Sequence, residues 1–249
     1  MPFLPKFRSA RLPALEEREH EVAGRRLSLK LVRNARATRL TLRIERGGAG
    51  LRVTVPPKTP TSEVDRFLLR QRGWLEARVQ KLPENPLVRP GAKLPVRGLP
   101  HLIVHEGGRG TVSLRQGAGG PEIVVHGDIR FLPRRLADFL KDEAKKELSI
   151  LVARHAAAVG RKPQAVRFRD TVSRWGSCTA GGTLSFSWRI MMAPPAVIDY
   201  LAAHEVAHLK EMNHGEKFWT LCHELCPRTD EAKAWLKRNG AALQAIGFG

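Results

Sequence analysis

The sequence is poor in cysteine and contains no long apolar run. Its 249 residues include only Cys178, Cys222 and Cys226, an odd and sparse set that argues against a disulfide framework and favours a reducing compartment. No apolar stretch is long enough for a membrane span, and the basic amino terminus lacks the apolar core of a signal peptide. We therefore expect a cytoplasmic protein with no membrane partner.

Acidic residues are scarce relative to basic ones. The chain has 43 Lys plus Arg against 24 Asp plus Glu, a formal charge of +19, which favours anionic partners, although a solvated basic surface gives the same count. Residues 25–52 carry nine Arg or Lys and one acid, Glu45. This half lacks the interleaved aromatic residues of a base-stacking platform and any nucleic-acid motif. Nucleic acid is thus a candidate partner of the basic N-terminal region.

Strand-like and helix-like patterns both occur, which predicts an α+β fold. Alternating apolar residues at 40–45 and 51–56, separated by glycines at 47, 48 and 50, predict a β-hairpin, and helical spacing follows at 61–82. A Pro- and Gly-rich connection at 83–100 precedes strand candidates at 101–106, 111–116 and 122–127. The longest expected helix covers 133–159 and ends at Gly160.

We predict two domains, with the boundary after residue 130. Residues 1–130 form a β-rich basic N-terminal region with one helix, and residues 131–249 form a compact second domain. In the second domain, strands at 165–169 and 183–190 precede a helix that opens near Pro194 and Pro195.

The stretch His-Glu-Val-Ala-His, residues 204–208, is a candidate metal site. His204 and His208 are four residues apart, so a helix places both imidazoles on one face, where they can share one ion. Glu205 lies on a neighbouring edge, where its carboxylate can reach a metal-bound water without being a ligand. A random chain of this length would show H-E-x-x-H roughly once in a hundred trials, so two histidines on an ordinary helix are the alternative interpretation.

A catalytic zinc ion usually has three protein ligands and one open position, so the pair requires a third ligand. His214 follows His204 by ten residues, and Asn213 and Gly215 favour a turn that brings the chain back past the helix end. Glu211 and Glu216 are alternative third ligands.

The cysteines offer a weaker candidate for a second, structural zinc site. Cys222, His223 and Cys226 could join Cys178, but the spacing is loose and no second Cys-x-x-Cys pair exists. Buried free cysteines are the better interpretation.

Three stretches closely resemble the YgjP-like metallopeptidase family, whose relatives are the SprT and WLM metalloprotease domains. They are Arg-Trp-Gly-Ser-Cys at 174–178, IDYLAAHEVAHLKEMNHGEKFW at 198–219 and Cys-Pro at 226–227. The resemblance implies a zincin-like domain whose active-site helix carries H-E-x-x-H. It also implies Zn²⁺ held by His204, His208 and His214, with Glu205 as general base. In such families the strand before the helix, here 183–190, is expected to form the rim of the substrate cleft.

We therefore predict a zinc-dependent metallopeptidase that hydrolyses protein or peptide substrates with metal-activated water. Zinc polarises the scissile carbonyl, while Glu205 takes a proton from the attacking water and passes it to the leaving amine. Arg174 or Tyr200 either donates to the oxyanion or makes a structural hydrogen bond. Two alternatives are a nucleic-acid-associated protein whose protease activity is directed to nucleic-acid-bound proteins, and a metal-stabilised scaffold without turnover. The sequence does not indicate an oligomeric state.

Overall fold

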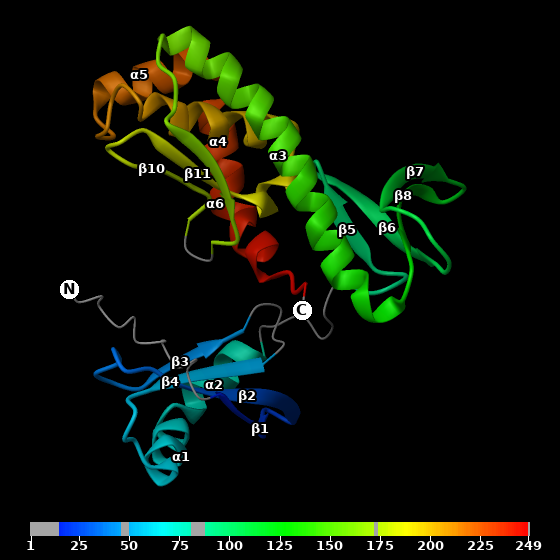
Figure 1. Ribbon diagram of the computed structural model, residues 1–249, viewed down its shortest axis with the longest axis vertical. Helices are drawn as coiled ribbons and strands as arrows, with labels where there is room; N and C mark the ends of the chain where they lie inside the picture. The colour runs from blue at the N-terminus through cyan, green and yellow to red at the C-terminus, as the bar shows by residue number, and fades with distance from the viewer. Residues whose placement is uncertain (1–14, 46–49, 81–87, 172–173, 249) are drawn as a thin grey trace, which may run out of the picture. The chain divides into compact units, whose positions relative to one another are not determined.

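The computed structural model describes residues 15–45, 50–80, 88–171 and 174–248. The chain divides into two compact units, unit 1 (Met1–Pro86) and unit 2 (Leu87–Gly249), each with its own buried apolar cluster (Figure 1). Helices and mixed sheets together make the fold α+β, as the sequence predicts. No helix in the described ranges is long and apolar enough to cross a bilayer.

Unit 1 is a four-stranded sheet with two helices on one face. The strand order is β1-β2-β4-β3, with β2 and β4 parallel and the other pairs antiparallel. Alternate residues of β2 and β4, among them Leu29 and Val53, share a buried cluster with Val64, Leu68 and Leu75 of the helices. The elements are β1 (Leu15–Val22), β2 (Arg25–Arg33), β3 (Thr41–Ile44), β4 (Gly50–Val55), α1 (Thr61–Arg70) and α2 (Arg72–Val79).

The sequence predictions for unit 1 are correct in part. β3 and β4 pair antiparallel, which confirms the hairpin strands, while the predicted glycine turn falls mainly on residues 46–49, outside the described residues. The single helix expected at 61–82 is divided at Gln71, whose φ of −91° and ψ of 2° depart from helical values. β1 was not expected, because its run Glu-Glu-Arg-Glu-His-Glu lacks apolar alternation.

Unit 2 begins with a second four-stranded sheet, ordered β5-β6-β8-β7. Its strands are β5 (Lys93–Val96), β6 (Leu99–Glu106), β7 (Ser113–Gly117) and β8 (Gly120–His126). Leu94, Ile103 and Ile123 share one buried cluster with Leu136 and Leu140 of α3 (Leu132–Val159). Since this sheet buries its apolar face in the same core as α3, the observed division falls at 86/87, whereas the sequence analysis placed it at 130/131.

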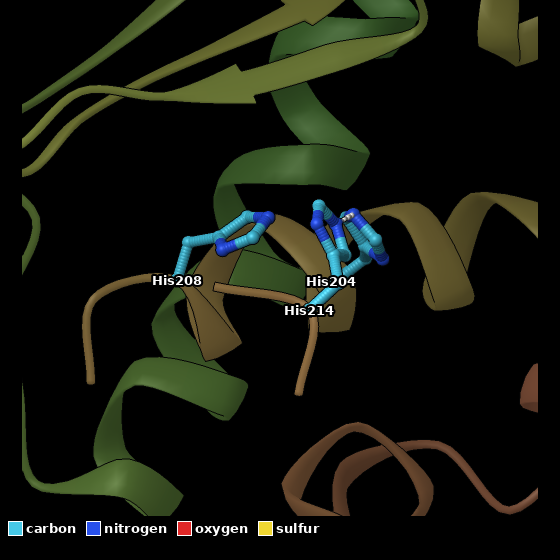
Figure 2. Close-up of side chains that lie close together, drawn as sticks. All are labelled: His204, His208 and His214. Carbon is cyan, nitrogen blue, oxygen red and sulfur yellow. Dashed lines mark hydrogen bonds between the residues drawn. The ribbon is translucent and has the colours of Figure 1, made fainter. Parts of the chain in front are cut away.

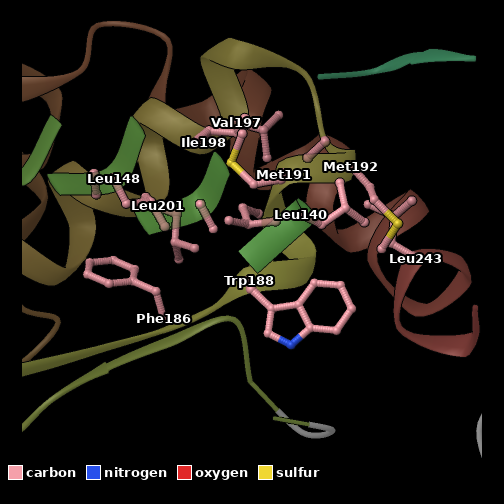
Figure 3. Packing of buried hydrophobic residues seen from close by; sticks show 14 of the residues in the cluster. Leu140, Leu148, Phe186, Trp188, Met191, Met192, Val197, Ile198, Leu201 and Leu243 are labelled. Carbon is pink, nitrogen blue, oxygen red and sulfur yellow. The ribbon is translucent and has the colours of Figure 1, made fainter. Parts of the chain in front are cut away.

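The remainder of unit 2 packs helices against a three-stranded sheet ordered β10-β11-β9. Figure 3 shows the core between them, where Leu140 and Leu148 of α3 lie among Phe186, Ile198 and Leu201. α3 ends at Gly160, which adopts a φ of 65°, as the sequence predicts. The elements are η2 (Ile129–Phe131), β9 (Ala165–Arg169), β10 (Gly176–Cys178), β11 (Thr183–Ser187), η3 (Trp188–Met192), α4 (Pro195–Ala207), α5 (Glu216–Leu225) and α6 (Thr229–Ala245).

The tight turn between β5 and β6, Arg97 and Gly98, is hydrogen-bonded to the segment that precedes α4. The N–H of Arg97 donates to the carbonyl of Met191 at 2.7 Å, and the N–H of Gly98 donates to the carbonyl of Met192 at 3.2 Å. A Cβ on Gly98 would lie 2.9 Å from the ring of Pro194, the residue before α4. The turn therefore needs glycine for its positive φ and for the close approach.

Gly98→Ala should destabilise unit 2. Its φ of 80° costs a non-glycine residue about 1 to 2 kcal/mol, and the contact with Pro194 adds to that cost. Gly91→Ala is the matched control, because Gly91 has the same φ of 80° with no atom within 4 Å of its Cβ position. Urea unfolding should show a larger loss for Gly98→Ala; equal losses would mean that the contact with Pro194 is unimportant.

Candidate metal centre

The three histidines of the sequence motif converge at the carboxyl end of α4 (Figure 2). α4 starts at Pro195, as the sequence predicts, and places His204 and His208 one turn apart. Beyond His208 the chain turns, with the N–H groups of Lys210 and Glu211 donating to the carbonyl of Ala207. His214 then returns to the helix just before α5.

The ring nitrogens of these histidines are close enough to share one ion. One nitrogen from each of His204, His208 and His214 lies within 4.8 Å of the others, and the Nε2 atoms of His204 and His214 are 3.2 Å apart. Three imidazoles at such distances match the ligand number of a catalytic zinc site, which leaves one position open. The arrangement therefore fits the expected metal without a backbone change.

The alternative ligands do not join this cluster. Glu211 contributes its backbone carbonyl to His208, and neither its carboxylate nor that of Glu216 belongs to the ligand group. Among the described residues, Cys178, Cys222, His223 and Cys226 form no group that could hold an ion. Cys222 and Cys226 are buried free thiols.

Hydrogen bonds to groups outside the cluster determine which ring nitrogens of His204 and His208 face it. Nδ1 of His208 donates to the carbonyl of Glu211 at 3.0 Å, and Nδ1 of His204 lies 3.4 Å from the hydroxyl of Tyr200. Both bonds leave Nε2 to face His214, as in metal-ligating histidines generally. Tyr200 is 6 % exposed and does not line the cavity, so its hydroxyl supports His204 and is not placed as an oxyanion donor.

Burial favours the neutral form of His204 and His208, which is the form that binds metal. Desolvation, with smaller contributions from His208, His214 and Lys233, lowers the pKa of His204 to about 3. Desolvation likewise lowers the pKa of His208. Phe218 covers the cluster from α5, with its ring centroid 4.5 Å from that of His208.

Glu205 points into the same region but has no hydrogen-bond partner for its buried Oε2 among the described residues. It is 4 % exposed, and desolvation raises the pKa of its carboxyl group to about 8, against the opposing charge of Arg174. A Cβ on Gly176 would lie 2.3 Å from Oε1, so the carboxyl group packs against the backbone of β10. A nearby cation would satisfy this carboxylate.

The cavity at the cluster has a volume of about 260 Å³. Its walls include Gly176, Ser177 and Cys178 of β10 and Met212, which is 47 % exposed. The prediction that strand 183–190 forms the cleft rim is wrong in two respects: β11 ends at Ser187, and it lies between β10 and β9. β10 is the edge strand that borders the cavity, and it was missed because three residues give no readable alternation.

Two tryptophans, Trp219 and Trp175, lie near the site. The ring centroid of Trp219 lies 5.7 Å from that of His214, and Nζ of Lys233 lies 4.0 Å from the Trp219 centroid. Trp175 packs against α6, since a Cβ on Gly240 would lie 3.0 Å from its indole nitrogen. Phe218 was not singled out from the sequence, although it follows His214 by four residues.

A histidine trio at the end of a buried helix, beside an unpartnered glutamate, defines a metallopeptidase-type centre. The family model described as YgjP-like, metallopeptidase domain, matches residues 38–239. The chain therefore belongs to the YgjP-like metallopeptidase domain family. No curated protein matches the chain.

Among solved structures, the metallopeptidase zymogen of Pyrococcus abyssi abylysin is similar at 20 % sequence identity. The match covers 36 % of this chain and 93 % of that chain, with a TM-score of 0.34.

Tyr200→Phe should weaken metal binding by about 10- to 100-fold, because removing the hydroxyl frees Nδ1 of His204 and loosens the ring. Competition with a chromogenic chelator measures the affinity. Thermal unfolding of the metal-free protein is the control, since a role in packing alone would lower stability and leave the affinity unchanged.

Proposed function

We propose that the chain is a zinc-dependent metallopeptidase in which His204, His208 and His214 hold the metal and Glu205 is the general base. The observation that carries the proposal is the convergence of three imidazole nitrogens within 4.8 Å, beside a buried carboxyl oxygen that has no hydrogen-bond partner in the described part of the chain. The YgjP-like metallopeptidase membership of residues 38–239 supports the same reaction class.

The donor set favours zinc over the hard cations. Neutral imidazole is a preferred zinc ligand, whereas Mg²⁺ and Ca²⁺ prefer oxygen ligands, and no carboxylate of the described residues belongs to this cluster. When bound, zinc polarises the scissile carbonyl and lowers the pKa of water.

Glu205 is positioned to move protons. It follows a ligand directly in sequence but points along a different edge of α4, toward the backbone of Gly176. Its carboxylate accepts a proton from the attacking water and returns it to the leaving amine. Burial strengthens its electrostatic interactions with the reacting groups, because water does not screen them.

The free edge of β10 provides a binding surface for an extended peptide. Trp175 and Thr179, which flank β10, both bond to the β11 side. The carbonyl of Trp175 accepts from the N–H of Ser187, and the N–H of Thr179 donates to the carbonyl of Thr183. Because backbone groups alternate along an antiparallel strand, those of Gly176 and Cys178 face away from β11. A substrate that adds to this edge by main-chain hydrogen bonds passes beside the histidines.

Glu205→Gln should abolish peptide cleavage while the protein still binds one zinc ion. General-base catalysis contributes about 10²- to 10⁴-fold to the rate of an enzyme. The cleavage rate of the variant should therefore be lower than that of the wild type by at least that factor. Cleavage of fluorogenic peptides measures the rate, and elemental analysis measures the zinc. His214→Ala is the comparison variant and should lose both activity and metal. Undiminished cleavage by Glu205→Gln, or a zinc-loaded wild type without any turnover, would contradict the assignment.

Gly176→Ala should lower kcat and leave the zinc content unchanged. The added Cβ would lie 2.3 Å from Oε1 of Glu205 and 2.6 Å from its Cδ, so the carboxyl group must move. A displacement of this kind can reduce the rate by about 10²-fold. Gly181→Ala, in the β10–β11 turn, is the matched control, because the nearest atom to its Cβ position is 3.6 Å away. Equal kcat values for the two variants would argue against a role for the Glu205 position.

A further inference from the structure

The outer face of the unit 1 sheet carries a row of cations. The helices cover the face that contains Leu29 and Val53, so the alternate residues of β2, β3 and β4 face the other way. In register, Lys30 pairs with Arg52, and Arg52 pairs with Arg43, across three neighbouring strands. Arg43 and Arg52 are exposed, and Lys30 is half-buried.

The acids near this row lie at Lys30 and Arg52: Glu17 of β1 is opposite Lys30, and Glu45 contacts both cations. Glu45 is shared, since it accepts from Lys30 at 3.3 Å and from Arg52 at 3.0 Å. Arg43 has no carboxylate partner among the described residues, although it lies directly opposite Arg52. Like charges placed opposite each other across two strands are destabilising. An anionic ligand on this face would offset that repulsion.

The loop between β2 and β3 adds exposed cations at the end of the sheet where β2 ends and β3 begins. Arg36 and Arg39 are exposed on it, and no Asp or Glu occurs between Arg33 and Ile44. Hydrogen bonds order the first part of the loop: the N–H of Asn34 donates to the carbonyl of Val55 at 2.9 Å, and the N–H groups of Arg36 and Ala37 donate to Oδ1 and the carbonyl of Asn34. An ordered loop loses little entropy when it binds a ligand.

Apart from Glu45, the acids of the described outer face lie at the opposite edge of the sheet. Glu17, Glu19 and Glu21 are on β1, on the same face as Lys30, whereas Arg43 is on the edge strand β3. The face is thus acidic at one edge and basic at the other. A polyanion would run along the β3 side, away from β1.

We propose that Lys30, Arg36, Arg39, Arg43 and Arg52 bind the phosphate backbone of a nucleic-acid duplex without regard to its sequence. Arginine guanidinium groups suit phosphate because they donate two parallel hydrogen bonds. The described aromatic residues of unit 1, Phe67 and Trp74, lie on α1 and α2 on the other side of the sheet, so this face has no platform for unstacked bases. The described residues of this face also include no exposed large apolar side chain of the kind that inserts into membranes. This binding goes beyond the proposed peptidase reaction and does not depend on it.

The test is binding of the full-length protein to a labelled mixed-sequence DNA or RNA duplex, followed by fluorescence anisotropy. Affinity should fall with salt, and the slope of log K against log[salt] should be about −3 to −5, since each of five phosphate contacts contributes about −0.9. The triple variant Arg36→Glu, Arg39→Glu, Arg43→Glu should bind at least tenfold more weakly, with a slope smaller by about 3.

The matched control is Arg66→Glu, Arg70→Glu, Arg78→Glu, which makes the same charge change on the helices of the same unit. Binding that is nearly unchanged in this control supports the assignment to the outer face. An equal loss in both variants would show that net charge alone attracts the duplex and would overturn it. The triple glutamine variant at Arg36, Arg39 and Arg43 should also lose affinity, and circular dichroism checks that each variant is folded.

Three further outcomes overturn the proposal. They are a wild type that does not bind the duplex at low salt, tighter binding to a single strand of the same length, and binding to phosphatidylserine vesicles but not to the duplex.

Discussion

The enclosure of α4 determines how the candidate site works. Nine residues of this helix are buried, including Ala202, Ala203 and Val206 around the histidines, so the side chains of Tyr200 and Glu205 have little access to water. Polar groups in such an interior need partners from the protein or from a ligand. Tyr200 and the carbonyl of Glu211 provide partners for the outer ring nitrogens. Among the described residues, Oε2 of Glu205 has no hydrogen-bond partner, and it faces the cavity that the three histidines line, where a cation fits.

The position of this helix depends on parts of the chain far from the motif. α3 runs along α4, and the β5–β6 hairpin bonds to η3 just before Pro194. Arg189 of η3 is almost fully buried, donates to the carboxylate of Asp170 and to the carbonyl of Ile246, and so connects η3 with the segments after β9 and after α6. The ligand helix is thus fixed at its amino end by several independent contacts, which limits the freedom of the histidines at its other end.

The sequence predicted the parts of the site that are local. His204 and His208 follow from helical spacing, and the return of His214 follows from a turn signal a few residues later. Gly176 and Tyr200 could not be assigned their contacts in this way. Gly176 approaches Glu205 from a strand 29 residues earlier in the chain, and a glycine gives no periodic signal. Tyr200 lies on the predicted helix, yet only coordinates show which nitrogen its hydroxyl meets.

The same distinction holds for the fold. α3 was predicted within one residue of its start because twenty-eight residues repeat one period, whereas β5 was read as a connection because it has four residues and includes Pro95. The unit boundary differs from the predicted one because strand patterns do not say which core a sheet will join. β5 to β8 look like an extension of the first sheet in sequence, but they bury their apolar face against α3.

The shortness of β10 has a consequence for selectivity. With three residues, it exposes backbone groups from only Gly176 and Cys178 at its free edge. Main-chain pairing over so short a length contributes little affinity and does not distinguish one amino-acid sequence from another. A polypeptide held there by backbone contacts alone would dissociate quickly. Efficient turnover would then favour chains that are unfolded or are brought to the enzyme by a second point of attachment.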